Sequence, residues 1–246
     1  MRVVGIDSSG ATASVALIED GQLIAERIHP DSETVRHAGP AGVKSNHAEV
    51  LLPLIEAVLT EARLTFTELS GLALTIGPGS FTGLRIGLST VKGLAYGWDI
   101  PVAGFSTLLA HAARVGDFDG VICSCLDARK NELYAALFRK TDHGLTRLTE
   151  DFLAPVEESI ARIRSLGGEA PCLFVGDATQ HYEKQLLDGF GRGARLARAD
   201  LVSSCAAAVA RLGMARLGNS ESDDPGKLAP LYLRPSEAEV KSGNRF

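Results

Sequence analysis

Two aspartates stand where a carboxylate could take part in phosphate chemistry. Asp7 ends an apolar stretch that is expected to be a strand. The hydroxyl-bearing residues that follow it are Ser8, Ser9 and Thr12. A carboxylate beside hydroxyls in a turn can hold a phosphate or its magnesium ion. Asp127 ends a second such strand, but residues 128–130 include no glycine for close approach to a phosphate. The alternative interpretation is structural, because aspartate before small residues commonly forms turns.

The glycine-rich segment 77–97 could also cradle phosphate, because glycines let backbone N–H groups approach an anion at a helix N-terminus. The segment follows an expected strand and has a helical pattern, in which each interior glycine costs roughly 0.5–1 kcal/mol relative to alanine. No Lys-Ser or Lys-Thr follows Gly83, and position 82 lacks the third glycine of a dinucleotide motif. The spacing therefore fits neither nucleotide-binding pattern.

Helical periodicity gathers the small residues of this segment into one stripe. Its members are Gly83, Gly87, Thr90, Gly93 and Gly97. An apolar face consists of Leu84, Leu88, Val91 and Ala95, and a polar face of Arg85, Ser89, Lys92 and Tyr96. A small-residue stripe lets two backbones pack closely, either inside the chain's own fold or against a partner. The partner interpretation predicts an interface of Gly79, Gly83, Arg85, Gly87, Thr90 and Lys92.

Composition excludes several classes of protein. The chain has 246 residues and a formal net charge of −5, with Lys and Arg scattered along it. It therefore lacks the basic stripe of a direct nucleic-acid binder, and we expect any RNA contact to be made through a partner. No apolar run approaches the ~18 residues of a membrane span, and the chain begins directly with a strand, so we expect a cytoplasmic protein. The four cysteines form no Cys-x-x-Cys pair and are expected to be buried thiols.

The expected elements repeat one order, three strands, a helix, a strand and a helix. Expected strands span 2–7, 13–19, 22–28, 72–76, 101–104, 121–127, 132–139, 145–151 and 172–175. Expected helices span 46–62, 80–97, 107–114, 155–165, 179–187 and 203–217, with Asn46 as a predicted N-cap paired with Glu49. We divide the chain into an N-terminal unit at 1–104 joined by the helix at 203–217, a C-terminal unit at 105–200, and a tail at 218–246.

Two tandem βββαβα units predict an α/β, actin-like fold, which is the duplicated RNase-H-like (ASKHA) architecture of actin, sugar kinases and Hsp70-type ATPases, with two lobes and mixed sheets. In that architecture a nucleotide binds between the lobes. Its candidate contacts here are the turns 7–12 and 127–130. A third candidate, Val175-Gly176-Asp177-Ala178, lies where such folds place an adenosine loop but lacks a double glycine.

Four stretches together resemble the bacterial TsaB (YeaZ) family. They are Gly5–Ser9, Gly77–Ala95, Asp127–Tyr134 and Pro230–Arg234. The resemblance spans nearly the whole chain. It implies a non-catalytic subunit of the complex that forms N6-threonylcarbamoyladenosine beside the anticodon of tRNAs reading ANN codons. It also implies pairing with the catalytic homologue TsaD, which transfers the threonylcarbamoyl group from threonylcarbamoyl-AMP, and work alongside the ATPase TsaE and the synthase TsaC.

The same resemblance supplies a test for catalysis. TsaD relatives carry a metal-binding His-x-x-x-His pair after a similar glycine helix, and the matching positions here are Thr107 and His111. One imidazole cannot hold such a metal without new ligands, and no His, Asp or Glu precedes His111 by four residues. We therefore expect no catalytic and no metal-binding residues, and we interpret His111 and His47 as ordinary helix histidines.

Other interpretations stay open. An ATP-dependent kinase or ATPase would use Asp7 as the carboxylate that holds magnesium or positions a water, and a glycopeptidase-type metallopeptidase would need a bound metal. The small-residue stripe is self-complementary, so the isolated chain could form a homodimer in the absence of its partner. The turn formed by Asp7, Ser8, Ser9 and Thr12 could hold ATP or ADP at an interface with the partner.

Overall fold

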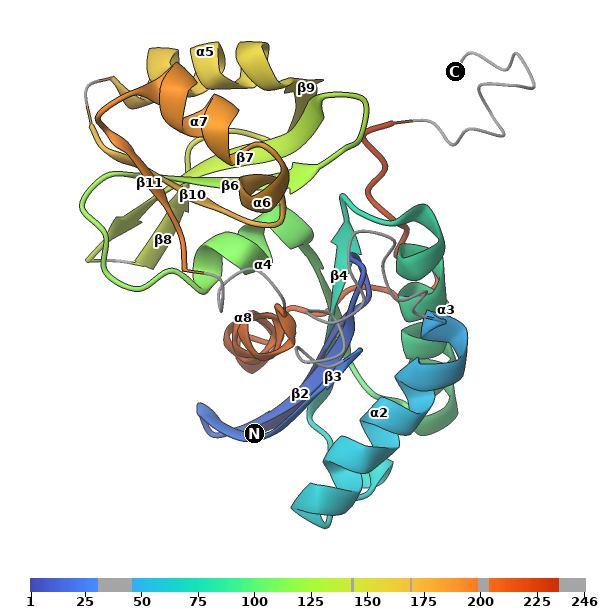
Figure 1. Cartoon of the computed structure of the whole chain (residues 1–246). Coiled ribbons are helices and arrows are strands. Elements are labelled where there is room, and N and C mark those ends of the chain that lie inside the picture. The colour runs from blue at the N-terminus through green and yellow to red at the C-terminus, as the bar shows by residue number, and fades with distance from the viewer. Residues whose placement is uncertain (31–45, 143, 169, 199–203, 235–246) are drawn as a thin grey trace.

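The structure is a computed structural model that describes residues 1–30, 46–142, 144–168, 170–198 and 204–234. It has two lobes, each built on a β-sheet (Figure 1). The first sheet contains β1 (Arg2–Asp7), β2 (Ala13–Glu19), β3 (Gln22–His29), β4 (Gly71–Gly77) and β5 (Val102–Ser106). The second contains β6 (Val121–Asp127), β7 (Glu132–Thr141), β8 (Gly144–Arg147), β9 (Phe152–Pro155), β10 (Cys172–Val175) and β11 (Ala194–Leu196).

Both sheets have the same strand order. The first runs β3-β2-β1-β4-β5, and the second runs β8-β7-β6-β10-β11, with β9 pairing along β7 beyond β8. In each sheet the first strand, β1 or β6, pairs antiparallel with the second and parallel with the strand on its other side, β4 or β10. This repetition confirms the predicted duplicated RNase-H-like, actin-like fold.

Helices cover both faces of each sheet. The helices are α2 (His47–Ala62), α3 (Phe81–Trp98), α4 (Thr107–Ala113), α5 (Val156–Gly167), α6 (Ala178–His181), α7 (Glu183–Phe190) and α8 (Ala206–Gly218), with a short 3-10 helix η2 (Phe66–Glu68). On the first sheet, α2 and α3 pack on one face and α8 packs on the other, as Figure 1 shows. On the second sheet, α5, α6 and α7 lie opposite α4.

Helix α4 joins the lobes through apolar packing. Its residues Leu108 and Ala112 are buried in one cluster with Ile122, Phe138 and other side chains of the second lobe. Its Ala110 lies in a different cluster with residues of the first sheet and of α8. The two faces of this short helix therefore belong to the cores of different lobes. At its N-terminus, Ser106 donates a hydrogen bond to Asp151 of the second lobe at 2.6 Å.

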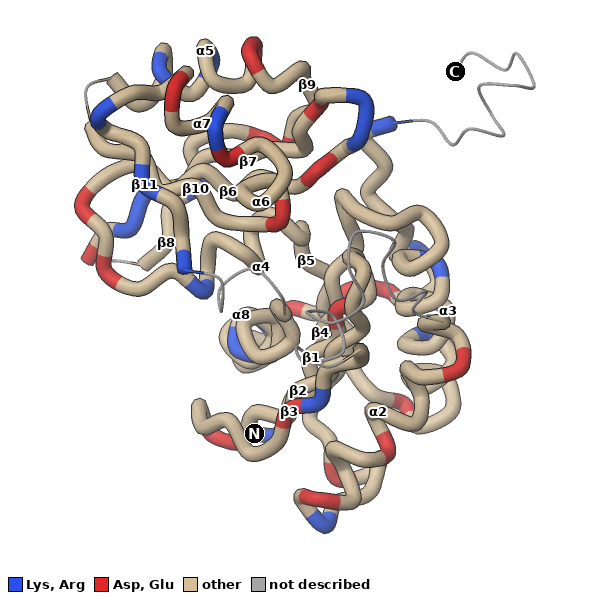
Figure 2. The backbone as a smooth tube through the Cα atoms, viewed as in Figure 1, with Lys and Arg blue, Asp and Glu red and all other residues tan. Residues whose placement is uncertain are grey.

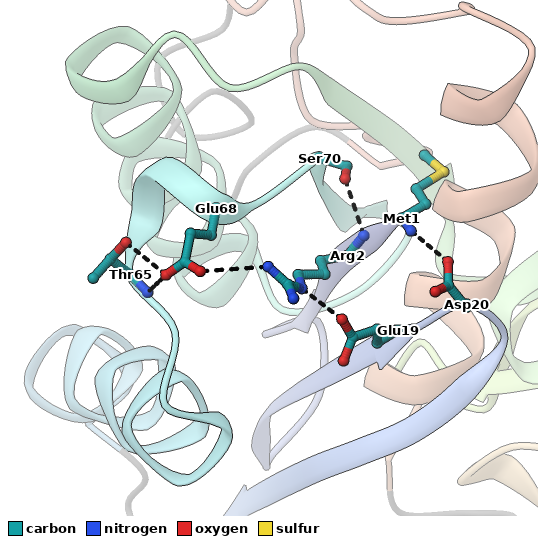
Figure 3. Close-up of polar contacts among 7 residues, drawn as sticks. All are labelled: Met1, Arg2, Glu19, Asp20, Thr65, Glu68 and Ser70. Atoms are coloured by element: carbon teal, nitrogen blue, oxygen red, sulfur yellow. Dashed lines mark hydrogen bonds and ion pairs between the residues drawn. The ribbon is translucent and has the colours of Figure 1, made fainter.

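A polar network fixes the amino-terminal edge of the first sheet, at the opposite end of β1 from Asp7 (Figure 3). The Arg2 guanidinium lies 2.6 Å from Glu19 and 3.4 Å from Glu68. Hydrogen bonds from the Thr65 backbone and hydroxyl lower the pKa of Glu68. The terminal ammonium pairs with Asp20. These contacts tie the start of β1 to β2 and to the segment before β4.

Charges of both signs are interspersed over the two lobes (Figure 2). Among the residues that the structure describes, no helix has both the length and the apolar character needed to cross a membrane. All four cysteines lie in the described ranges as buried thiols, as predicted.

The elements differ from the predictions at a few places. The expected strand 145–151 is shorter, because β8 ends at Arg147, and β9, which pairs with a different part of β7, was not predicted. The expected helix 179–187 is divided into α6 and α7, and β11 was not predicted. Asn46 stands at the N-cap of α2 without a side-chain capping hydrogen bond, so the predicted capping box with Glu49 is wrong. Of the predicted tail, residues 235–246 lie outside the described residues.

Candidate functional site

The carboxylate of Asp7 is fixed by the chain's own hydrogen bonds. Asp7 is buried at the end of β1, and its Oδ1 accepts from the Ser9 backbone N–H at 3.0 Å and the Ser9 hydroxyl at 2.6 Å. The Thr75 hydroxyl of β4 donates to the same oxygen at 2.8 Å. Three donors therefore converge on one oxygen atom, and they orient the carboxylate within the first lobe.

The glycines of α3 pack on this aspartate turn. A Cβ placed on Gly83 would lie less than 3.0 Å from the Ser8 carbonyl oxygen, and one on Gly87 less than 3.0 Å from the Ser8 hydroxyl. Gly79 approaches Ser9 in the same way. The Ser8 hydroxyl also donates to the Gly83 carbonyl oxygen at 2.9 Å. A larger residue at Gly83 would press on the Ser8 backbone and push α3 away from the turn.

The structure thus joins two groups of residues that the sequence analysis kept apart. The predicted nucleotide contacts Ser8 and Ser9, which follow Asp7, pack against the predicted partner contacts Gly79, Gly83 and Gly87. Thr12, half-buried, stands at the start of β2 beyond the turn. Close packing inside the chain explains why these three glycines are needed. Of the two interpretations left open, packing inside the chain's own fold accounts for these glycines, and contact with a partner stays a prediction.

The last two glycines of the predicted stripe face solvent. Gly93 and Gly97 are exposed, and no atom lies within 4 Å of a Cβ placed on either one. Thr90 and Lys92 are half-buried, and the Arg85 residue is exposed. The predicted apolar face is confirmed, because its members are all buried. They are Leu84, Leu88, Val91 and Ala95.

The turn after Asp127 in the second lobe is held by hydrogen bonds to the Asp127 side chain and has a left-handed backbone. The Asp127 Oδ1 accepts from the Arg129 backbone N–H and the Tyr182 hydroxyl, each at 2.8 Å. Residues 129–131 have φ angles of 64°, 55° and 60°, in the left-handed region that side chains disfavour. This turn therefore carries Arg129 and Lys130, both exposed, in place of glycine.

Asp177 and Tyr182 complete this second turn. Asp177 accepts a 2.8 Å hydrogen bond from the Asp127 backbone N–H, because β6 and β10 are parallel and end at the same edge. Burial raises the pKa of Asp177. Burial, together with the hydrogen bond to Asp127, raises the pKa of Tyr182 to about 12. Sequence reasoning singled out the segment around Asp177 but missed Tyr182, since nothing in its sequence neighbourhood indicates a contact with position 127.

The two positions matched to a metal-binding histidine pair are buried between the lobes. Thr107 begins α4, and His111 lies one turn later. Within the described ranges, no three His, Cys, Asp or Glu side chains come together in a way that could hold a metal ion. A separate cavity of about 610 Å³ lies between β3, α4 and α8, and none of the predicted site residues lines it.

Comparison with known proteins places the chain. The family model of TsaD, tRNA N6-adenosine threonylcarbamoyltransferase, matches residues 22–241. The tRNA threonylcarbamoyladenosine biosynthesis protein TsaB of Escherichia coli is 33% identical over 69% of both chains, and that of Bacillus subtilis is 29% identical over 98% of this chain and 97% of its own length. The chain belongs to the TsaB (YeaZ) family.

Two further comparisons fit this TsaB assignment. The structure of YeaZ from Pseudomonas aeruginosa has a TM-score of 0.75 to this chain, with 23% identity, over 94% of this chain and 99% of its own. This likeness shows a shared fold. A tRNA N6-adenosine threonylcarbamoyltransferase of Geotalea uraniireducens is 34% identical over 120 residues, which are 47% of this chain and 35% of that protein. TsaB-type and TsaD-type sequences are thus both recognisable relatives of this chain.

Proposed function

We propose that this TsaB-family chain is a non-catalytic subunit of the complex that forms N6-threonylcarbamoyladenosine in tRNAs reading ANN codons. The observation that carries the proposal is the similarity to the TsaB protein of Bacillus subtilis along 98% of the chain, which leaves little of the sequence for another activity. We infer a cytoplasmic role beside a TsaD-type transferase and a TsaE-type ATPase, with tRNA contacted through the complex.

The non-catalytic part of the proposal rests on Thr107. A threonine at this position removes one imidazole from the pair that the resemblance assigns to a metal, and both Thr107 and His111 are buried. The Asp7 carboxylate is saturated at Oδ1 by three donors, which supports a structural role for it.

A docking face for the TsaD-type partner follows from the exposed side of α3. The predicted contacts Arg85, Thr90 and Lys92 lie on or beside this side. Gly93 and Gly97 stand open next to Tyr96, whose exposed fraction is 68%. Two open glycines beside an exposed aromatic ring would let a partner helix approach closely. We propose that the same face forms the homodimer when the partner is absent.

The central experiment is reconstitution. The TsaD, TsaE and TsaC homologues of the same organism are incubated with unmodified tRNA, with and without this chain, and threonylcarbamoyladenosine is measured by nucleoside mass spectrometry. We expect modification to depend on the chain. Equal modification in its absence would refute the proposed role.

The docking face is tested by Gly93→Leu, which meets open space in the monomer. We expect no loss of stability, since replacing this helix glycine favours the helix, together with loss of TsaD binding in calorimetry and a change in self-association in sedimentation. The matched control is Ala161→Leu, at an exposed position on α5 in the other lobe. Wild-type binding by the Gly93 variant would remove this face from the proposal.

Assays on the isolated chain distinguish the alternative function, that of an ATP-dependent enzyme, from the proposed one. It requires tight ATP binding and turnover that Asp7→Asn abolishes. We expect neither from the chain alone. Nucleotide binding that appears only after TsaD is added would instead place ATP or ADP at the shared interface.

A further inference from the structure

The segment after α8 connects the two lobes along their outer edge. We name residues 223–234 the C-terminal strap. In Figure 1 it is the red segment that runs from the first lobe past the upper end of α3 to the second lobe. It has no helix, and one isolated bridge pairs its Asp223 with Val102 of β5. Specific side-chain and backbone contacts hold the rest of its path.

Four hydrogen bonds anchor the strap to the first lobe. Asp223 makes two hydrogen bonds with the Arg216 guanidinium of α8, at 2.6 and 2.9 Å, and accepts a third from the Gly104 backbone N–H at 2.8 Å. Further along, the Leu231 backbone N–H donates to the Ile76 carbonyl oxygen at 2.7 Å. The strap therefore follows the carboxyl end of β4 as far as the loop that leads into α3.

The next residue clamps the first turn of α3. The Tyr232 ring stacks on Phe81 with 4.6 Å between the ring centroids. The Arg85 guanidinium lies 3.8 Å from the centre of the Phe81 ring, and its Nε donates to the Tyr232 hydroxyl at 2.9 Å. Stacking, cation–π attraction and a charge-assisted hydrogen bond act on the same three side chains.

Arg234 then crosses to the second lobe. Its guanidinium donates to the Ala128 carbonyl oxygen at 2.8 Å and pairs with the Glu132 carboxylate. The two charged side chains are 26% and 29% exposed, so water screens this pair less than it would screen a pair at the open surface. Both acceptors flank the left-handed turn after Asp127, at the rim of the second lobe.

Among the residues that the structure describes, the lobes are also joined at the apolar helix α4 and at the Ser106–Asp151 contact at its start. One central junction permits rotation of the lobes about it, whereas a second attachment at the rim removes that freedom. We propose that the C-terminal strap fixes the angle between the two lobes, with Arg234 as the releasable contact. The strap also connects the first turn of α3 to the second lobe. A change in the angle between the lobes would therefore alter the contacts of that turn.

The lobe angle can be measured directly in the full chain. Spin labels are placed at Ala57→Cys on α2 and Ala161→Cys on α5, which are exposed positions, whereas the native thiols are buried. We expect one narrow distance population for the labelled parent protein. Arg234→Ala should broaden it or add a second population. The matched control Arg129→Ala removes an 81% exposed side chain from the same turn and should leave the distances unchanged.

A second variant and a second readout separate loss of the strap from loss of fold. Glu132→Gln keeps the shape of the acceptor and removes its charge, so it should broaden the distances less than Arg234→Ala does. Hydrogen exchange at the Leu231 amide should stay slow in both variants, because the first-lobe anchors remain. Distances identical to the parent in both variants, or a parent that is already broad, would overturn the proposal.

Discussion

The two aspartate turns occupy the same place in their sheets and are held in different ways. Asp7 and Asp127 each end the first strand of a unit, beside a parallel neighbour. The first is covered by α3, which reaches Ser8 through its glycines. The second is open at its tip, where Arg129 and Lys130 are exposed, and is braced by Tyr182 and Asp177.

The two copies of the duplicated turn therefore differ in the elements that surround them. In the first lobe, the glycines of α3 let the helix backbone pack closely on the turn. In the second lobe the left-handed backbone of residues 129–131 is accepted without any glycine, at a cost that roughly reaches 1–2 kcal/mol per residue for such conformations. Side-chain hydrogen bonds and the strap contact at Ala128 and Glu132 offset that cost.

The largest expected loss of stability comes from a substitution that disrupts the packing of α3 on the turn after Asp7. Gly83→Ala places a methyl group against the Ser8 carbonyl oxygen, which cannot move without disturbing β1. We expect a loss of about 1–3 kcal/mol in unfolding free energy, measured by urea denaturation. Gly93→Ala, on the same helix but in open space, should gain up to about 1 kcal/mol from helix propensity. Equal midpoints for the two variants would show that α3 does not pack on the turn.

The next largest expected effect is the difference in stability loss when each of the two carboxylates is removed. Asp7→Ala leaves three donors on Ser9 and Thr75 without an acceptor in a buried site, and we expect a loss of about 2–3 kcal/mol. Asp127→Ala leaves the exposed Arg129 N–H and the Tyr182 hydroxyl, which water can satisfy in part, and we expect about 1 kcal/mol. Thermal denaturation of both variants measures the ranking, and the reverse order would contradict the comparison.

The smallest effect depends on pH. Burial raises the pKa of Asp177 in the folded state, so the folded chain binds its proton more tightly than the unfolded chain does. The contribution of Asp177 to stability is therefore present below the usual aspartate pKa, near about 4, and is lost as the pH rises through the raised value. Asp177→Asn should gain stability relative to the parent as the pH rises across this window. A pH-independent difference in urea denaturation would count against it.

Much of the fold was predictable because its patterns are local. The apolar runs of β1 and β6, each ending in aspartate, and the faces of α3 were read from periodicity. The division of 179–187 into α6 and α7 and the pairing of the short β11 depend on packing between distant segments, which periodicity does not contain.

The candidate site was predictable as a set of residues but not as an arrangement. Glycine spacing predicted close packing on α3 but could not distinguish a partner from the chain's own Ser8. Tyr182 and Arg234 meet the turn around Asp127 across 55 and 106 residues of sequence. Such contacts arise from the tertiary structure, and no local spacing indicates them.

The position of α8 bears on how the protein is made. This helix, near the end of the chain, supplies one wall of the first lobe, where its Val209 and Ala210 share a core with Val3 and Ala73. A ribosome therefore releases the strands of the first lobe long before the residues that cover them. Domains of most proteins fold in the order of their synthesis. Here the second lobe has all of its strands and covering helices once β11 has been translated, whereas the first lobe must wait for α8.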